Sequence, residues 1–164
     1  MKTSGSPAHT TVLFGLLAGP ASVPAAMALD LFFTGAQAFR LVLWLALAVY
    51  AVMLVRWAGV RLREIGFPLG ILLLLLFFSL PLSIYLMLLT AVLSWIRSGI
   101  CFPAPLFRGL FTELILSLGG GALVVSLAPH SAFTWALGIG LFFLVQGFYF
   151  VLSGNREEDE EHGN

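Results

Sequence analysis

Few residues in this sequence have the type and spacing to do chemistry. The chain contains no GxxxxGK[ST], HExxH, CxxC or GxSxG motif, which are common signatures of phosphate binding, metal binding and nucleophilic catalysis. Its three histidines fall in a leader, a turn and a tail, which favours solvated side chains over a metal site. The single cysteine, Cys101, excludes an internal disulfide, and acylation of this residue is a less favoured alternative to a plain structural role. We therefore expect no enzymatic activity, no cofactor and no metal.

Glu113 is the one residue that supports a sharper chemical hypothesis. It is the only acid well inside an apolar run, where a carboxylate must pair with a base or become protonated. We consider a polar cluster inside the membrane, in which Glu113 meets Arg40 or Gln146 and could bind a proton or ligand. The candidate members are Glu113, Arg40, Thr90, Ser94, Gln146 and Tyr149. We favour the simpler interpretation that Glu113 pairs with Arg108 or reaches lipid headgroups, because its position is shallow.

The composition indicates the environment of these residues. Hydrophobic residues make up 60% of the chain and charged residues 10%, whereas about a quarter of the residues of soluble domains are charged. Such a chain buries its apolar surface in lipid, so we predict an all-α, polytopic transmembrane helix bundle. Eight basic residues balance eight acidic ones, and this neutral net charge gives no indication of nucleic-acid binding.

Four membrane spans are predicted, at about residues 38–57, 67–96, 109–128 and 132–152. Segment 67–96 is the strongest signal, because it contains no charged residue and about 18 apolar residues suffice to cross a hydrocarbon core of ~30 Å. Residues 97–108 contain a glycine and two prolines and are expected to form a non-helical connector at the membrane surface. The acidic tail, residues 154–164, is expected to be solvated and disordered.

The first 28 residues allow two interpretations. Lys2, a short apolar stretch, a proline and the Ala26-Met27-Ala28 motif come in the order of a signal peptide cleaved after Ala28. The alternative is an uncleaved first span from about residue 11 to residue 33, which would make five spans. We slightly favour the signal peptide, since Pro20 and Pro24 would each remove a hydrogen bond from a spanning helix.

Segment 67–96 allows two topologies. A single crossing keeps the backbone hydrogen bonds inside one long, tilted or kinked helix, and Leu80-Pro81-Leu82 lacks the Gly or Asn typical of turns. A re-entrant hairpin at Pro81 would instead gather most arginines on the cytoplasmic side, as the positive-inside rule favours. We predict the single crossing, because satisfying the backbone in lipid is the stricter constraint. Either topology places the basic loop 56–64 in the cytoplasm.

Stripes of small and polar residues recur on three of the predicted spans. Small residues let helix backbones approach in lipid, and hydroxyl groups bond across the contact. The predicted packing seam consists of Ser79, Ser83, Ser117, Gly119, Gly120, Gly121 and Gly138. The stripes therefore predict contacts between helices, both within the chain and with other membrane proteins.

These observations favour an assembly, anchor or scaffold subunit whose partners are the lipid bilayer and other membrane helices, in a homo-oligomer or a membrane complex. The first alternative is a small oligomeric transporter or channel with Glu113 as its proton- or ligand-coupling residue. The second, ranked last, is a lipid-modifying enzyme that uses the arginines of connector 97–108, for which no nucleophile or base is visible. Short loops and the absence of an organelle signal favour the bacterial inner membrane.

Overall fold

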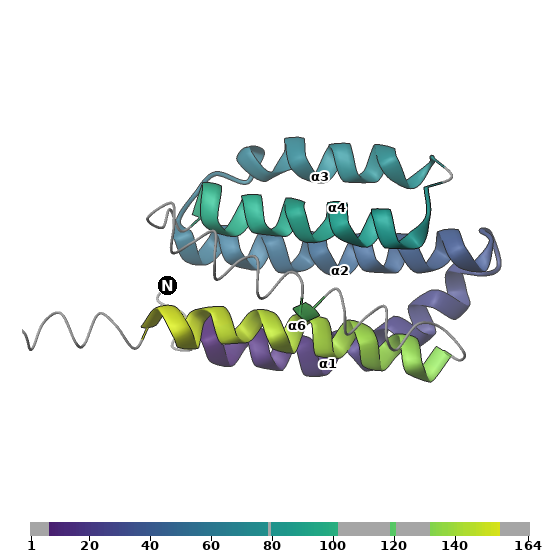
Figure 1. Cartoon of the computed structure of the whole chain (residues 1–164), viewed down its shortest axis with the longest axis horizontal. Helices are drawn as coiled ribbons and strands as arrows, with labels where there is room; N and C mark the ends of the chain where they lie inside the picture. Colours follow the sequence, from purple (N-terminus) through teal and green to yellow (C-terminus); the bar gives the residue numbers. More distant parts are fainter. Residues whose placement is uncertain (1–6, 79, 102–118, 121–131, 155–164) are drawn as a thin grey trace, which may run out of the picture.

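The computed structural model describes residues 7–78, 80–101, 119–120 and 132–154, and these residues form helices and no strand. The helices are α1 (Pro7–Leu29), α2 (Gly35–Ala58), α3 (Arg63–Leu76), α4 (Leu82–Ser94), the π-helix η1 (Trp95–Cys101) and α6 (Ala132–Gly154). Figure 1 shows α1 lying along α6, and α2 lying along α3 and α4. The predicted all-α class is confirmed for the described residues.

Three of the described helices are long and apolar enough to cross a membrane: His9–Leu29, Gly35–Ala58 and Leu82–Cys101. The apolar stretch Ala136–Gly147 within α6 is shorter. At ~1.5 Å per residue, the 24 residues of α2 extend over ~36 Å, more than the ~30 Å of the hydrocarbon core. These helices fit the membrane location that the composition predicts.

Segment 67–96 is not one helix. α3 ends at Leu76, the chain then reverses, and α4 begins at Leu82 and runs back along α3 (Figure 1). The reversal brings the ring of Phe67 to within 6.4 Å of the Trp95 ring, centroid to centroid. The prediction of one long helix over segment 67–96 is therefore wrong. The physical reason is that Pro81 takes an extended conformation (φ −56°, ψ 143°) and begins a new helix, so it does not merely kink a continuous one.

The connector predicted for residues 97–108 also differs. Its first five residues continue α4 as η1, so the expectation of non-helical chain is wrong for residues 97–101, and residues 102–108 lie outside the described part. The first proline of the connector comes only at residue 103, so nothing before it interrupts a helix. The Ser98 hydroxyl donates a 2.7 Å hydrogen bond to the Ser94 carbonyl across this junction.

The predicted last span, 132–152, corresponds closely to α6. Most of the predicted span 109–128 and residues 155–164 of the acidic tail lie outside the described residues.

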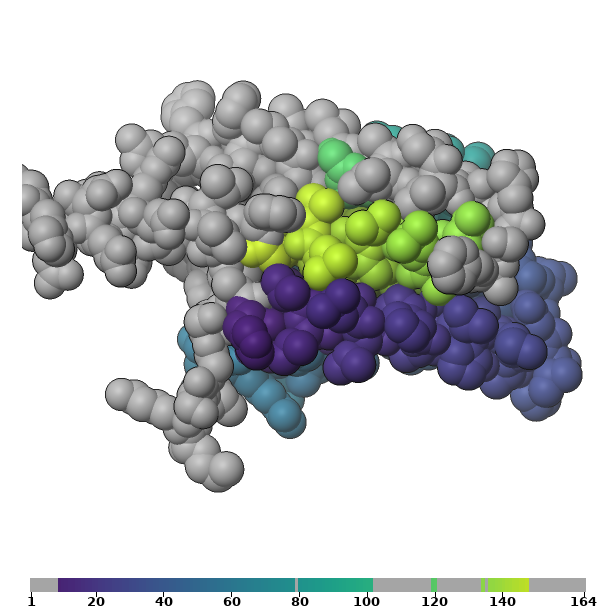
Figure 2. All heavy atoms as spheres, turned by 90° about the horizontal axis from the view of Figure 1, so that it is seen from below, coloured from purple at the N-terminus to yellow at the C-terminus, as the bar shows by residue number. Residues whose placement is uncertain are grey.

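α1 runs without interruption through Pro20, Pro24 and the Ala-Met-Ala motif that suggested a cleavage site. Both prolines are exposed, so their rings point away from the neighbouring helices. Figure 2 shows α1, in purple, lying against α6, in yellow-green. α1 is thus a packed helix of the bundle.

Glycines set the close approach of α1 and α6. A Cβ added at Gly15 would lie 2.9 Å from the Leu144 amide nitrogen, and one at Gly19 would lie 2.8 Å from the Ala136 carbonyl oxygen. Gly140 on α6 faces both, since its own Cβ would lie 3.2 Å from the Gly15 carbonyl oxygen and 3.5 Å from the Gly19 Cα. Gly15 and Gly19 therefore form a GxxxG contact, the arrangement that lets two membrane helices touch through their backbones. The sequence analysis did not single out this motif.

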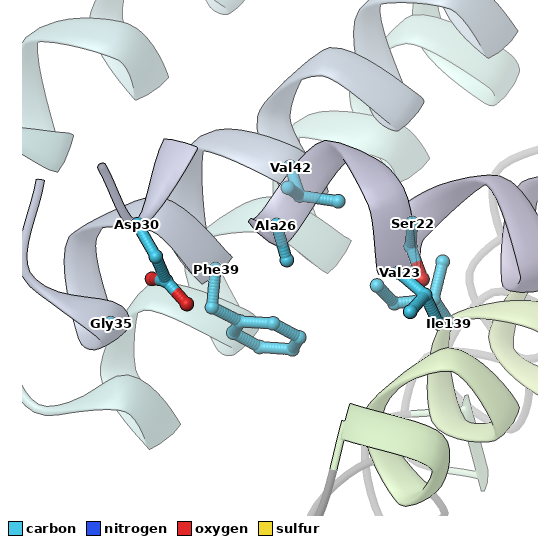
Figure 3. A pocket seen from close by; sticks show the side chains of 8 residues that line it. All are labelled: Ser22, Val23, Ala26, Asp30, Gly35, Phe39, Val42 and Ile139. Atoms are coloured by element: carbon cyan, nitrogen blue, oxygen red, sulfur yellow. The ribbon is translucent and has the colours of Figure 1, made fainter. Parts of the chain in front are cut away.

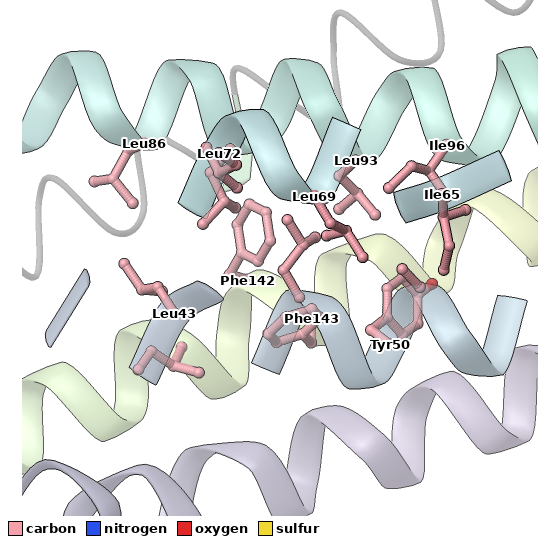
Figure 4. Close-up of a cluster of buried hydrophobic side chains, with 14 of the residues drawn as sticks. Leu43, Tyr50, Ile65, Leu69, Leu72, Leu86, Leu93, Ile96, Phe142 and Phe143 are labelled. Atoms are coloured by element: carbon pink, nitrogen blue, oxygen red, sulfur yellow. The ribbon is translucent and has the colours of Figure 1, made fainter. Parts of the chain in front are cut away.

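Helices α2, α3, α4 and α6 share one apolar core (Figure 4). α2 contributes Leu43, Leu47, Tyr50 and Leu54, which are buried and spaced three or four residues apart, as one face of a helix requires. Side chains from α3, α4 and α6 fill the opposite side, among them the buried Leu72, Leu93, Phe142 and Phe143. This core places the polar residues described next at the two ends of the bundle.

Candidate functional site

Arg97 is a charged residue that the fold buries completely. It lies in η1 with no exposed surface, and its Nη1 donates a 2.7 Å hydrogen bond to Oε1 of Gln146 on α6. Gln146 is itself only 1% exposed. Burying a charged guanidinium costs several kcal/mol unless it is hydrogen-bonded or paired. The Arg97–Gln146 bond therefore both offsets this cost and ties η1 to α6.

The backbone around Arg97 is shaped to admit this contact. π-helical turns are rare and occur frequently at functional sites, and η1 is seven residues long. On the other side of the contact, a Cβ at Gly120 would lie 3.4 Å from Nε2 of Gln146 and 3.0 Å from the Phe142 ring. A glycine at this position thus leaves room for the amide that receives the arginine.

Arg40 holds the turn of the α3–α4 hairpin. Its Nη1 donates to the Phe78 carbonyl at 3.3 Å and its Nη2 to the Leu80 carbonyl at 2.5 Å. The guanidinium carbon also lies 5.9 Å from the centre of the Tyr85 ring, a cation–π geometry, and the Tyr85 hydroxyl donates back to the Arg40 carbonyl at 3.5 Å. A turn between helices leaves carbonyls without helical partners, and Arg40 satisfies two of them.

The structure does not bring Arg40 and Gln146 together as the predicted cluster required. Arg40 contacts the turn before α4, whereas Gln146 contacts Arg97 just beyond the end of α4. The 13 residues of α4 lie between Leu80 and Arg97 and extend over ~20 Å. The two polar groups therefore lie at opposite ends of the bundle, because the hairpin reverses the direction of α4 relative to a single crossing.

The other predicted members of the cluster lie in different surroundings. Thr90 is buried, but its hydroxyl contacts the carbonyls of Leu86 and Met87 in its own helix, at 3.1 Å and 2.8 Å. Ser94 is half-buried at the end of α4. Tyr149 belongs to α6, and its side chain is not described. Glu113 lies outside the described residues.

The predicted packing seam is divided in the same way. Gly120 and Gly138 are buried, whereas Ser83 and Gly119 are exposed. A Cβ at Gly119 would have nothing within 4 Å. Ser79, Ser117 and Gly121 lie outside the described residues.

Sequence reasoning missed the burial of Arg97 because it assigned this residue to a surface connector. Two signals were available in the sequence. First, Arg97 directly follows an uncharged helical run. Second, Ser94 and Ser98 are four residues apart, as on one face of a helix, and no proline occurs before residue 103.

The described residues contain no group of three or more His, Cys, Asp or Glu side chains placed to hold a metal ion. No protein-family model, curated protein or solved structure matches this chain.

Proposed function

We propose that the protein is a multi-pass membrane subunit that assembles with other transmembrane helices through the outer face of α3. The observation that carries this proposal is a second GxxxG pair, Gly66 and Gly70, on that face. Both glycines are exposed, and a Cβ at either would meet nothing within 4 Å. Phe67 and Leu74 on the same helix are 66% and 62% exposed.

The two GxxxG pairs of the chain differ in whether another helix covers them. The pair on α1 is closed by α6 at backbone contact, as described above, whereas α3 lies at the edge of the bundle, farthest from α1 and α6 (Figure 1). Because lipid offers no hydrophobic drive between helices, close backbone approach at small residues is the main source of association. With 14 residues, or ~21 Å, α3 is also shorter than the ~30 Å core, and such short spans favour oligomerisation.

The proposed orientation places the ends of α2, η1 and α6 and the starts of α1 and α3 in the cytoplasm. Figure 1 shows these five ends at the same end of the bundle. Arg56, Arg61 and Arg63 are exposed there, which the positive-inside rule favours. In this arrangement α1 is retained as a span, since removing it would uncover the glycine face of α6. The bacterial inner membrane remains the expected location.

The assembly proposal is tested by placing leucine at Gly66 and Gly70, singly and together. Because the space above both glycines is open, we expect the monomer to fold normally and the complex to be lost in blue-native gels and in-membrane crosslinking. Gly70→Ala is the matched control: it improves helix propensity by about 0.5–1 kcal/mol and adds only one methyl group. A Gly66→Leu/Gly70→Leu protein that still runs as the same complex, or a wild-type protein that is monomeric in native membranes, would overturn the proposal.

The complete burial of Arg97 supports one alternative, a small oligomeric transporter or channel. Intramembrane charges mark substrate or ion pathways by default, and Glu113 would be the coupling residue that completes such a pathway. A single protein with this few helices rarely encloses a transport pathway, and this function therefore also requires an oligomer. It predicts proton-linked flux in proteoliposomes that Glu113→Gln abolishes while assembly is retained. Flux that Glu113→Gln leaves unchanged excludes Glu113 as the coupling residue.

A further inference from the structure

A groove between α1 and α2 lies apart from both arginine sites. It consists of two cavities of about 230 and 200 Å³, which share Ser22 and Val42 in their walls. Each cavity alone is smaller than the ligand-binding pockets of proteins, which begin at about 300 Å³, and the two together exceed that volume. The groove exists because glycines seat α1 closely on α6, while the α1 residues that face α2 are too small to fill the remaining space. These small residues are Ala18, Ala21, Ala25 and Ala26.

The walls of the groove suit a hydrocarbon chain. Apart from Asp30 at one end, its only polar side chain is Ser22, whose hydroxyl donates a 2.6 Å hydrogen bond to the Gly19 carbonyl and is thereby satisfied. Such an apolar space cannot hold water, which needs two to four polar partners. Left empty, it would forfeit dispersion contacts along its whole lining.

The opening and length of the groove match one leaflet of a bilayer. Leu45 and Val49 on its rim are 43% and 53% exposed, so it opens sideways toward the surrounding lipid. Along α2 its lining extends from Gly35 to Val49, fourteen residues or ~21 Å. The part beyond the Asp30 end, from Phe39 to Val49, covers ~15 Å, which is half the ~30 Å hydrocarbon core. An acyl chain from one leaflet occupies this depth.

Asp30 marks the headgroup end of the groove. Figure 3 shows its carboxylate beside Phe39 and Gly35 at the mouth of the larger cavity. The next two residues, Leu31 and Phe32, are 80% and 81% exposed, as expected for a loop that dips into the interfacial region. An exposed carboxylate at this position attracts a cationic headgroup and repels one whose net charge is negative.

We propose that the α1–α2 groove binds a phospholipid with a primary ammonium headgroup, its acyl chain lying along Val42 and its ammonium meeting Asp30. Charge complementarity at Asp30 selects the headgroup, and the alanine face of α1 accommodates the chain. The site is independent of the assembly proposed for α3, because none of its lining residues belongs to that helix.

Native mass spectrometry of the full-length protein tests this site. The protein is released from detergent that contains equal amounts of phosphatidylethanolamine and phosphatidylglycerol with identical acyl chains. We expect one retained lipid and a preference for phosphatidylethanolamine of about two- to fivefold, the upper part of the range of an exposed ion pair. The isosteric Asp30→Asn should remove the preference while one lipid is still retained. Ala26→Leu, which places a branched side chain in the larger cavity and obstructs it, should remove the lipid itself.

Two matched variants serve as controls. Leu17→Phe adds bulk to α1 at a residue that is 68% exposed and outside the groove, and Glu64→Gln removes an acid at the opposite end of the bundle. Both should retain the lipid and the preference of the wild type. Equal binding of the two phospholipids by the wild type, or an Ala26→Leu protein that retains as much lipid as Leu17→Phe, would overturn the proposal.

Discussion

At the scale of single residues, Arg40 and Arg97, which are partly and fully buried, act through directed hydrogen bonds to neutral oxygens. Arg97 donates to a side-chain amide and Arg40 to two backbone carbonyls. The planar guanidinium suits this role because its five donors point in fixed directions and its charge is delocalised. A lysine at either position would offer a compact, strongly hydrated charge, which is costlier to remove from water.

The contribution of the Arg97–Gln146 bond can be measured with Gln146→Leu. The substitution keeps the side chain's approximate volume but leaves the buried guanidinium without this acceptor, so we expect a loss of about 1–3 kcal/mol in the free energy of unfolding. Reversible unfolding in mixed micelles, followed by circular dichroism, provides the measurement. Leu137→Ala, at a residue of α6 that is 42% exposed, should change stability much less. Equal effects of the two substitutions would contradict a stabilising role for the bond.

At the scale of elements, the α3–α4 hairpin depends on a residue outside itself. The chain reverses between α3 and α4, and the carbonyl groups at such a turn lack helical partners, so each one left unsatisfied away from water costs several kcal/mol. Arg40 on α2 supplies the missing donors. α2 is therefore the element that makes a turn at Pro81 possible.

Arg40→Ala tests this dependence. It removes donors from the Phe78 and Leu80 carbonyls together, so we expect a loss of at least about 2 kcal/mol in stability. The turn should also become more accessible, which labelling of a Phe77→Cys reporter by a water-soluble maleimide would detect. Arg40→Lys retains a cation but not the fork of donors, so its stability and its labelling should lie between those of the wild type and those of Arg40→Ala. Unchanged labelling and stability in Arg40→Ala would show that the turn is held by other groups.

The α1–α6 contact makes a second prediction at this scale. Leucine at Gly19 would meet the backbone of α6, which cannot move aside as a side chain can. We therefore expect the free energy of unfolding to fall by about 3 kcal/mol, the upper end of overpacking costs. Leucine at Gly66, with the same GxxxG spacing but open space above it, should leave the stability of the monomer almost unchanged. Thermal unfolding in detergent compares the two variants directly. Similar melting temperatures would rule out a tight α1–α6 contact.

At the scale of the whole molecule, the hairpin determines at which end of the bundle each loop lies. The chain passes from the start of α1 to loop 30–34, returns through α2 to loop 59–62, and goes out and back again through α3 and α4. Each of these passages ends at one of the two ends of the bundle.

Topology reporters fused after Phe32, Leu62, Pro105 and Asn164 test this arrangement. We expect cytoplasmic signals at the last three positions and an external signal at Phe32, because η1 and α6 end where α2 ends. A single crossing of segment 67–96 would instead give an external signal at Pro105. That result would contradict the hairpin in the membrane.

The retention of α1 is tested by the mass of the protein isolated from membranes. An uncleaved chain has a mass of 17.7 kDa, whereas cleavage after Ala28 would leave residues 29–164. We expect the full mass, since α1 packs on α6 through Gly15 and Gly19. A mature protein that begins at residue 29 would show that α1 is a signal peptide.

The amino-acid sequence by itself determined the membrane class, the helical fold and the approximate limits of α2 and α6, because long uncharged runs have few stable alternatives in lipid. It also revealed that residue 81 was the point where two topologies diverged. Tertiary structure decided between them, since the choice depends on whether Arg40, about forty residues earlier, reaches the carbonyls of the turn. The burial of Arg97 has the same origin: its acceptor, Gln146, lies 49 residues away, and no local pattern encodes a contact between helices so distant in the chain.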